Sequence, residues 1–364
     1  MIELDGSCGE GGGALVRVAL ALSTLTGQPF HIDNIRSGRK DPGLKAQHLS
    51  AITALQQLSK ATCTPVELGS TSFSFTPGAI ESGIYTIDIG TAGSITLLLQ
   101  ALILPCLFAP GKITLKIKGG TCGKWQASVD YLQHLLLPQL RRFAEQIELK
   151  ILRRGYYPQG QGEILLEIWP KFKQKQYPSP AEFLAMLQLE ISPINLTEQG
   201  KLEHIRGMID LSKDLAEQDV AERIKKAAEY KLKNLCVPVH IRTEYAQSAC
   251  AGGQILLWGV FTNLGEVDAR NPVLLGASVL LEKNKSSEHI GQEAASLLMK
   301  EIDSEIAVDS YLQDQLIPFM ALLPHSCIKV GVVTEHSKAN FYVAEKFLDV
   351  VFTVDGNIIK SEAL

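Results

Sequence analysis

Apolar and polar positions in the first 35 residues follow the order strand, turn, helix and strand. Residues 2–5 read IELD, a glycine-rich segment GSCGEGGG comes next, and PFHIDNI closes the stretch. Between them, apolar residues recur with the helical period of about 3.6 residues, at positions 15, 18, 19, 22 and 25. Gly27 stands where a helix commonly ends in a left-handed residue. The pattern predicts a β–α–β unit whose helix covers residues 14–27.

The same order of elements recurs twice further along the chain. Residues 85–117 read YTIDIGTAGSITLLLQALILPCLFAPGKITLKI, which is again a strand, a turn of small residues, an apolar helix and a strand. A weaker copy is YLQDQLIPFMALLPHSCIKVGVV at 311–333. Such self-similarity predicts a domain built from repeated β–α units.

The texture of the sequence changes between the second and third copies. The segments LQLEISPINL, VPVHIRTEY and QILLWGVF read as strands or short apolar elements, and AEQDVAERIKKAAEYKLKN reads as a charged helix. We therefore expect an α/β (α+β) protein. Residues 186–280 would form a small α+β domain, inserted into a large repeat domain made of residues 1–185 and 281–364.

Composition agrees with an ordinary globular protein. The chain has 364 residues, of which 46% are hydrophobic and 20% charged. The longest apolar run is interrupted by Gln100 and Pro105 and is too short to span a bilayer, and the N-terminus lacks a secretory pattern. Seven cysteines without zinc-type spacing indicate reduced thiols. These features predict a cytoplasmic protein that does not enter a membrane.

Charge narrows the kinds of nucleic-acid contact that the protein can make. A net charge of −4 argues against a broad basic face that grips a duplex. The loop IRSGRKDPGLKAQH nevertheless gathers Arg36 and Arg39 just before a helix that carries Gln47. Two arginines at i and i+3 can converge on one phosphate through forked hydrogen bonds. A solvated basic loop is the alternative.

The glycine-rich segment allows two interpretations. Gly9, Gly11 and Ala14 fit the dinucleotide pattern G-x-G-x-x-A, but DGSC separates them from the strand, so a tight turn explains them equally well. Glu10 falls within the glycine-rich segment, where we expect free backbone N–H groups, and Arg17 follows in the predicted helix. Together they suit a metal that bridges phosphates. The sequence contains neither a Walker loop nor the K-x-D-G signature of lysine-adenylylating ligases.

His336 stands between an apolar run, KVGVV, and the helical pattern ANFYVAEKF. At such a strand-to-helix junction side chains can face a cleft. An imidazole with a pKa of about 6.5 is mostly neutral at pH 7 and can attack phosphorus. A solvated turn would also place a histidine here.

Taken together, the motifs resemble one family. They are DGSCGEGGGALVR, IRSGRKDPGLKAQHL, IGTAGSITLLLQ, GGT, RGYYPQGQGE, YLQDQ and EHSKAN, in this order. The combination resembles the RNA 3′-terminal phosphate cyclase family from residue 2 to about residue 350. The resemblance implies a large domain of three repeated units, as in the enolpyruvyl transferases, with a smaller inserted domain.

The resemblance also implies a reaction. ATP would adenylylate a histidine and release pyrophosphate, and AMP would then pass to the 3′-terminal phosphate of an RNA. Attack by the neighbouring 2′-hydroxyl would form a 2′,3′-cyclic phosphate and release AMP.

Site residues follow from the motifs that match. His336 would be the adenylylated nucleophile, and Glu10 would bind a divalent cation, Mg or Mn. Arg17, Arg36, Arg39 and Gln47 would hold the phosphates of ATP or the RNA end. The ATP pocket would contain Gln100 and the YLQDQ residues Tyr311, Leu312, Gln313, Asp314 and Gln315.

Two departures from the family pattern stand out. CGKWQASVD at 122–130 replaces a run that forms the adenine side of the pocket, where Trp125 offers a substitute surface, and Ala339 replaces a common threonine.

Two other functions use the same fold. A non-catalytic relative acting in ribosomal RNA processing would not need His336, Glu10 and YLQDQ together. A phosphotransfer or enolpyruvyl enzyme would form no covalent AMP.

Overall fold

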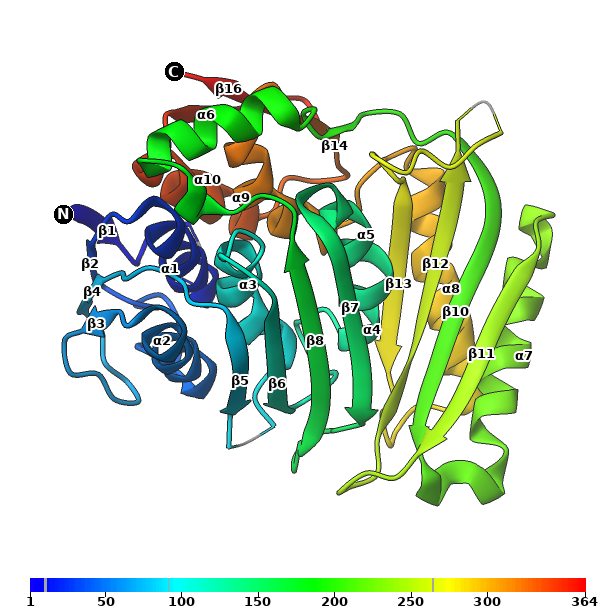
Figure 1. Cartoon of the computed structure of the whole chain (residues 1–364). Helices are drawn as coiled ribbons and strands as arrows, with labels where there is room; N and C mark the ends of the chain where they lie inside the picture. Colours follow the sequence, from blue (N-terminus) through cyan, green and yellow to red (C-terminus); the bar gives the residue numbers. More distant parts are fainter. Residues whose placement is uncertain (10–11, 91, 264) are drawn as a thin grey trace.

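The computed structural model describes residues 1–9, 12–90, 92–263 and 265–364 (Figure 1). Its strands are β1 (Ile2–Asp5), β2 (Phe30–Asp33), β3 (Thr62–Cys63), β4 (Phe73–Thr76), β5 (Gly83–Asp88), β6 (Ile113–Gly119), β7 (Ala144–Arg153), β8 (Gly162–Pro170), β9 (Asn195–Leu196), β10 (Lys201–Ser212), β11 (Val239–Ala246), β12 (Gly253–Thr262), β13 (Leu274–Leu280), β14 (Cys327–Lys329), β15 (Val350–Asp355) and β16 (Ile358–Ala363). Its α-helices are α1 (Gly13–Thr26), α2 (Ala46–Ser59), α3 (Ile95–Cys106), α4 (Val129–Tyr131), α5 (Leu137–Leu140), α6 (Pro180–Glu190), α7 (Val220–Leu232), α8 (Ser287–Asp303), α9 (Leu312–Leu322) and α10 (Glu335–Phe347). A π-helical turn, Leu132–Leu136, joins α4 to α5.

Three of the four sheets in the described residues share one topology. Their strand orders are β1-β2-β4-β3, β5-β6-β8-β7 and β9-β14-β16-β15. In each sheet the first two strands are parallel and the other two pairings are antiparallel. The mixed α/β character expected from the sequence is confirmed. The specific likeness to enolpyruvyl transferases stays a prediction.

The third unit is split in the sequence. Its first strand, β9, pairs with β14. All strands of the fourth sheet, β10 to β13, lie between these two strands in the sequence. The copy recognised at 311–333 therefore begins at a helix, α9, because its first strand lies far upstream. This separation explains why the third repeat is the weakest in the sequence.

The fourth sheet, β11-β10-β12-β13, has a hydrophobic core of its own with α7 and α8. This core draws its residues from Ile205 to Ile306. The segment that forms this smaller core therefore begins and ends later in the sequence than the inserted domain expected at residues 186–280. Upstream, α6 buries Phe183 and Leu187 in the larger core and β9 pairs there. Downstream, α8 packs on α7 and β13, although it lies beyond 280.

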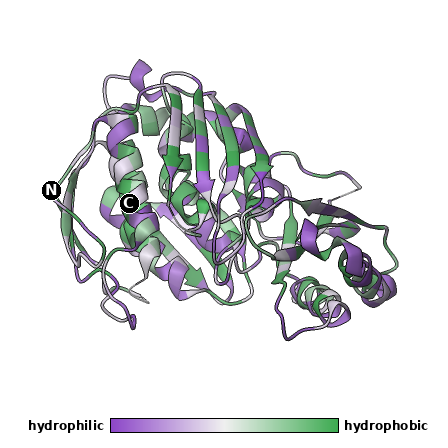
Figure 2. Ribbon diagram, turned by 90° about the horizontal axis from the view of Figure 1, so that it is seen from below, coloured by the Kyte–Doolittle hydropathy of each residue, from purple (hydrophilic) through white to green (hydrophobic). Residues whose placement is uncertain are grey.

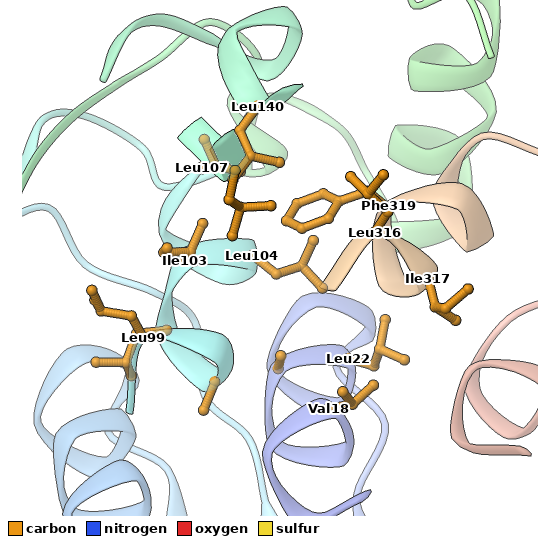
Figure 3. Close-up of a cluster of buried hydrophobic side chains, with 14 of the residues drawn as sticks. Val18, Leu22, Leu99, Ile103, Leu104, Leu107, Leu140, Leu316, Ile317 and Phe319 are labelled. Atoms are coloured by element: carbon orange, nitrogen blue, oxygen red, sulfur yellow. The ribbon is translucent and has the colours of Figure 1, made fainter. Parts of the chain in front are cut away.

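Helix α1 lies at the centre of the larger core. The sequence predicts one apolar face, yet every residue from Ala14 to Thr26 is buried because α2, α3 and α10 pack around the helix. Gly27 ends it with a φ of 72°, as expected. In Figure 3, side chains of α1 such as Leu22 point toward Leu104 of α3 and Leu316 of α9. One core thus joins helices from all three units.

Strand alternation also follows the sequence. Along β8, buried and partly exposed residues alternate without interruption, and hydrophobic and hydrophilic bands alternate along the strands in Figure 2. β12 is buried along its whole length, and the ring of its Trp258 stacks on His134 of the second unit, with centroids 4.6 Å apart. Within the described part of the chain, no helix has the length and apolar character needed to cross a bilayer.

A buried ionic network joins the second unit to the fourth sheet. The Arg154 guanidinium donates hydrogen bonds to both carboxylate oxygens of Asp130 and, at 2.8 Å, to Glu244 Oε2. It also lies 3.6 Å from Asp210 Oδ2, and the Tyr156 hydroxyl donates to Asp210 Oδ1 at 2.9 Å. Three carboxylates thus surround one cation. Burial, followed by repulsion from Asp130, raises the pKa of Asp210 to about 7.

Replacement of Asp210 should change the pH dependence of stability. A raised carboxyl pKa means that the folded protein binds more protons than the unfolded chain, so Asp210 increasingly destabilises the fold as pH rises from about 4 to about 7. Asn keeps an acceptor for Tyr156 and carries no charge. We expect Asp210→Asn to be more stable than wild type at pH 8 by on the order of 1 kcal/mol, and by less at pH 5.

Urea unfolding at the two pH values measures this difference. Glu244→Gln is the control, since Glu244 is partly exposed, with 43% of its side chain accessible, and its ion pair should contribute on the order of 1 kcal/mol. An equal loss of stability in Asp210→Asn at both pH values would contradict the prediction.

Candidate active site

A cavity of about 840 Å³ opens where the first turns of several helices meet. Helices α1, α2, α3 and α10 and the residues just before α2 and α3 contribute to its lining. These residues are Gly13, Ala14, Lys45, Gln47, His48, Ala92, Gly93, Ser94, Leu97 and His336. The first turn of a helix has backbone N–H groups without intrahelical partners and a partial positive charge. Several such ends around one cavity therefore favour an anionic ligand.

The smaller core supplies the opposite wall. Residues 251–253 and Leu280 and Leu281 line the cavity from that side. Nearby, the Lys124 ammonium lies 3.1 Å from Glu282 Oε1, which ties the loop 122–126 to the segment after β13. The site thus lies between the two cores. The inserted segment therefore forms part of the cavity wall, which its sequence did not indicate.

Side-chain charge in the cavity is positive. Among the described lining residues are five cations, Arg17, Arg36, Arg39, Lys45 and Lys124, and no aspartate or glutamate. The whole chain, in contrast, carries a net charge of −4. Cationic groups at low-dielectric walls focus the field and concentrate anions. The arrangement suits a ligand with several phosphates.

Arg17 is fixed in the floor of the cavity. It is only 6% exposed, and its Nε donates a 2.7 Å hydrogen bond to Gln100 Oε1. Burial lowers the pKa of Arg17 to about 10, so it remains charged at pH 7. Burial also raises the pKa of Asp314 to about 7, although Arg17 favours the ionised carboxylate.

His48 adds a second donor next to Arg17. Its Nδ1 accepts the Lys45 backbone N–H at 2.9 Å, and its Nε2 lies 3.5 Å from Arg17 Nη1. Burial, and then the positive charge of Arg17, lower the pKa of His48 well below its usual value. The neutral ring therefore carries its proton on Nε2. Two donors side by side suit an acceptor such as a phosphate oxygen.

The arginine loop folds toward the same cavity. The Arg39 backbone N–H donates to Arg36 O at 3.0 Å, which closes a turn, and Arg36 has a φ of 57°. Gly43, with a φ of 78°, ends the loop where a Cβ would lie 2.1 Å from Gly69 O. Burial, and then repulsion from Arg39, lower the pKa of Arg36. Both arginines line the same cavity, and their convergence on one phosphate stays a prediction.

His336 is held by the first turn of α10. Thr334 caps this helix, and its Oγ1 accepts the Ser337 N–H at 3.0 Å. Behind the cap, Gln313 Oε1 accepts from Thr334 N and Ser337 Oγ, while Gln313 Nε2 donates to Val332 O at 3.1 Å. One glutamine therefore fixes both the approach to α10 and its first turn. The strand before His336 is shorter than expected, since β14 ends at Lys329.

The glycine-rich loop packs against the histidine. A Cβ built on Gly12 would lie 3.4 Å from His336 Cε1 and 3.6 Å from Arg39 Nη2. The imidazole and the guanidinium thus border one small space beside α1. Gly13 is tighter still, because its Cβ would lie 2.2 Å from His48 Nε2.

The predicted site residues fall into two layers. His336, Arg17, Arg36, Arg39 and Gln47 all line the cavity.

Gln100 and the run from Tyr311 to Gln315 do not line the cavity. Instead, Gln100 holds Arg17, Gln313 holds the start of α10, and Asp314 O accepts a hydrogen bond from Asn340. Their contact with ATP stays a prediction. Glu10 lies outside the described residues.

Comparison with known proteins now adds to the geometry. The sequence model of the family described as RNA 3′-terminal phosphate cyclase matches residues 8–354. The chain belongs to this family. Proteins named RNA 3′-terminal phosphate cyclase from Pyrococcus furiosus and Archaeoglobus fulgidus are each 38% identical to it. The alignments cover 98% of this chain and 96% of the first relative, and 99% of this chain and 99% of the second.

Sequence reasoning missed part of the cyclase-family site. Lys45 and His48 belong to the motif IRSGRKDPGLKAQH, but only its arginines and Gln47 were predicted as site residues. Lys124 and Tyr157 also line the cavity. The wall at 251–253 gives no signal in the sequence, because only the fold brings it to the site.

Two alanine substitutions in the glycine loop should separate binding from folding. Gly12→Ala adds a methyl at ordinary contact distance and fills the space between His336 and Arg39. We expect unchanged thermal stability and about tenfold weaker binding of inorganic tripolyphosphate by calorimetry, which is about 1.4 kcal/mol.

Gly13→Ala is the matched comparison. Its methyl would overlap the buried His48 ring, so we expect a stability loss of about 1–3 kcal/mol. A Gly12→Ala variant that binds tripolyphosphate as wild type does would contradict the geometry given for His336 and Arg39.

Proposed function

We propose that this protein uses ATP to convert an RNA 3′-terminal phosphate into a 2′,3′-cyclic phosphate, through a covalent His336–AMP intermediate and an RNA adenylate. The observation that carries the proposal is the position of His336 in a cavity with five cations. Membership of the cyclase family and the names of its relatives support the RNA substrate.

In the first step, an unprotonated ring nitrogen of His336 attacks the α-phosphorus of ATP. A P–N bond forms, the bond from that phosphorus to the bridging oxygen breaks, and pyrophosphate leaves with the electron pair. Arg17, Arg39 and the helix N-termini offset the negative charge of the triphosphate. Gln313 acts through its hydrogen bonds to the start of α10, which position the ring.

In the second step, an oxygen of the RNA 3′-phosphate attacks the AMP phosphorus. The P–N bond breaks, and its electron pair returns to the imidazole. The 2′-hydroxyl then attacks the activated 3′-phosphorus, loses its proton to solvent and displaces AMP. Because nucleophile and phosphorus belong to the same ribose, this closure gains from intramolecular proximity.

A divalent cation, Mg or Mn, is part of the proposal. Within the described residues, no group of three or more His, Cys, Asp or Glu side chains could hold a metal ion. Mg²⁺ nevertheless needs only one or two protein carboxylates when phosphate oxygens and water complete its ligands. We assign this role to Glu10, and the bound cation would neutralise phosphate charge. The seven unpaired cysteines support a cytoplasmic location.

Covalent labelling tests the nucleophile. Incubation with α-labelled ATP and Mg or Mn should give acid-labile, alkali-resistant label on the wild-type protein, and His336→Ala should abolish it. His289→Ala is the control, since His289 is an exposed histidine on α8. Unchanged labelling of His336→Ala would refute the assignment. A wild-type protein that binds RNA but takes no label would favour the non-catalytic relative.

The arginine loop offers a second test. Arg36→Ala and Arg39→Ala should each lower the labelling rate roughly tenfold or more, where tenfold is about 1.4 kcal/mol. Lys40→Ala, in the same exposed loop but outside the lining, should label normally. Melting temperatures of all three variants should match wild type. Insoluble or unstable arginine variants would point instead to a structural role for the loop.

A further inference from the structure

Two aromatic side chains lie almost uncovered at the mouth of the cavity. Trp125 is 92% exposed and Tyr157 is 80% exposed, and both belong to the lining. Tyr156, in the same lining, and Trp258 of β12 are in contrast buried and partnered. Tyr156 donates a hydrogen bond to Asp210, and Trp258 stacks on His134.

Folding does not account for these two rings. A side chain that remains exposed contributes little hydrophobic stabilisation. Trp125 also has a φ of 61°, a left-handed conformation that is uncommon for bulky residues. Strained backbone of this kind clusters at ligand sites.

The two loops that carry the rings are fastened to each other. The Thr121 N–H donates to Gly155 O at 2.8 Å, and the Gly155 N–H donates to Thr121 Oγ1 at 3.1 Å. Each loop is also fixed on its own side. Lys124 pairs with Glu282, and the Gly160 N–H donates to Tyr156 O at 2.7 Å. The backbone that carries the two rings is therefore fixed before any ligand arrives.

Cationic cavities edged with exposed aromatic rings fit single-stranded nucleic acid. Bases stack on aromatic faces while cations track the phosphates. A wall for the adenine of ATP would be expected deeper in the cavity and partly covered, whereas a polymer must leave through the mouth. We propose that Trp125 and Tyr157 stack on the last bases of the RNA 3′ end. This inference rests on the proposed function for the identity of the substrate.

Binding of a short oligoribonucleotide with a 3′-phosphate tests the inference. Trp125→Ala and Tyr157→Ala should each raise the Kd about tenfold, and Trp125→Phe should recover most of the affinity. Tyr230→Ala is the control, since Tyr230 is equally exposed, at 80%, but lies on α7 and outside the lining. Labelling by α-labelled ATP decides between this inference and the adenine contact expected for Trp125 from the sequence: stacking on RNA predicts normal labelling of Trp125→Ala, and a contact with adenine predicts weaker labelling.

An RNA whose last two nucleotides are abasic makes the test specific to stacking. It keeps the 3′-phosphate and the 2′-hydroxyl but has no base to stack. Wild type should bind it about tenfold more weakly, and Trp125→Ala and Tyr157→Ala should cause no further loss. Non-additivity of this kind isolates the contact between ring and base.

Three results would overturn the inference. Unchanged RNA affinity in both alanine variants is one. Loss of ATP labelling in Trp125→Ala with normal RNA binding is another, because it would assign the ring to adenine. The third is a loss of affinity for the abasic RNA in Trp125→Ala and Tyr157→Ala that equals their loss of affinity for the normal RNA. If wild type takes no label but shows the stacking dependence, the inference stands and only the proposed chemistry fails.

Discussion

Burial of α1 on all sides is the constraint from which the site follows. The helix packs against α2, α3 and α10, and its first turn ends at the cavity. Side chains of α1, α3 and α9 interlock in the same core (Figure 3). Because an interior of this density resists displacement, the helix ends that border the cavity keep a fixed spacing. Backbone N–H groups from different units can then face one ligand.

A second layer of polar side chains turns that scaffold into a site. Gln100 aims Arg17, the Lys45 N–H fixes the tautomer of His48, and Gln313 fixes the start of α10. None of these contacts needs a ligand to form. Preorganised donors of this kind stabilise charge without rearranging during a reaction.

Local patterns in the sequence predicted elements well where a unit is continuous. The stripe at 15, 18, 19, 22 and 25 placed α1 within one residue, and Gly27 marked its end. The third unit was recognised only from α9 onward, because its first strand comes before the inserted segment. The inserted segment was seen as a change of texture, but α8 was not included, since no local signal tells which core a helix joins.

The motifs indicated which residues gather at the site, but not which of them line the cavity and which support the lining from behind. His336, Arg17, Arg36 and Arg39 line one cavity, and their roles in catalysis and binding stay predictions. Sequence could not show that Gln100 and Gln313 stand behind them, because depth depends on packing between units. The cavity wall at 251–253 is likewise a product of the inserted segment's position.

The split third unit also bears on how the chain is made. About 130 residues separate β9 from its partner β14, so this sheet cannot close while the ribosome is still producing the inserted segment. The first two sheets, built from nearby sequence, have no such delay. Closing long loops slows folding, and a waiting strand can pair wrongly with other chains. At two residues, β9 offers a very short edge, and short edges limit such pairing.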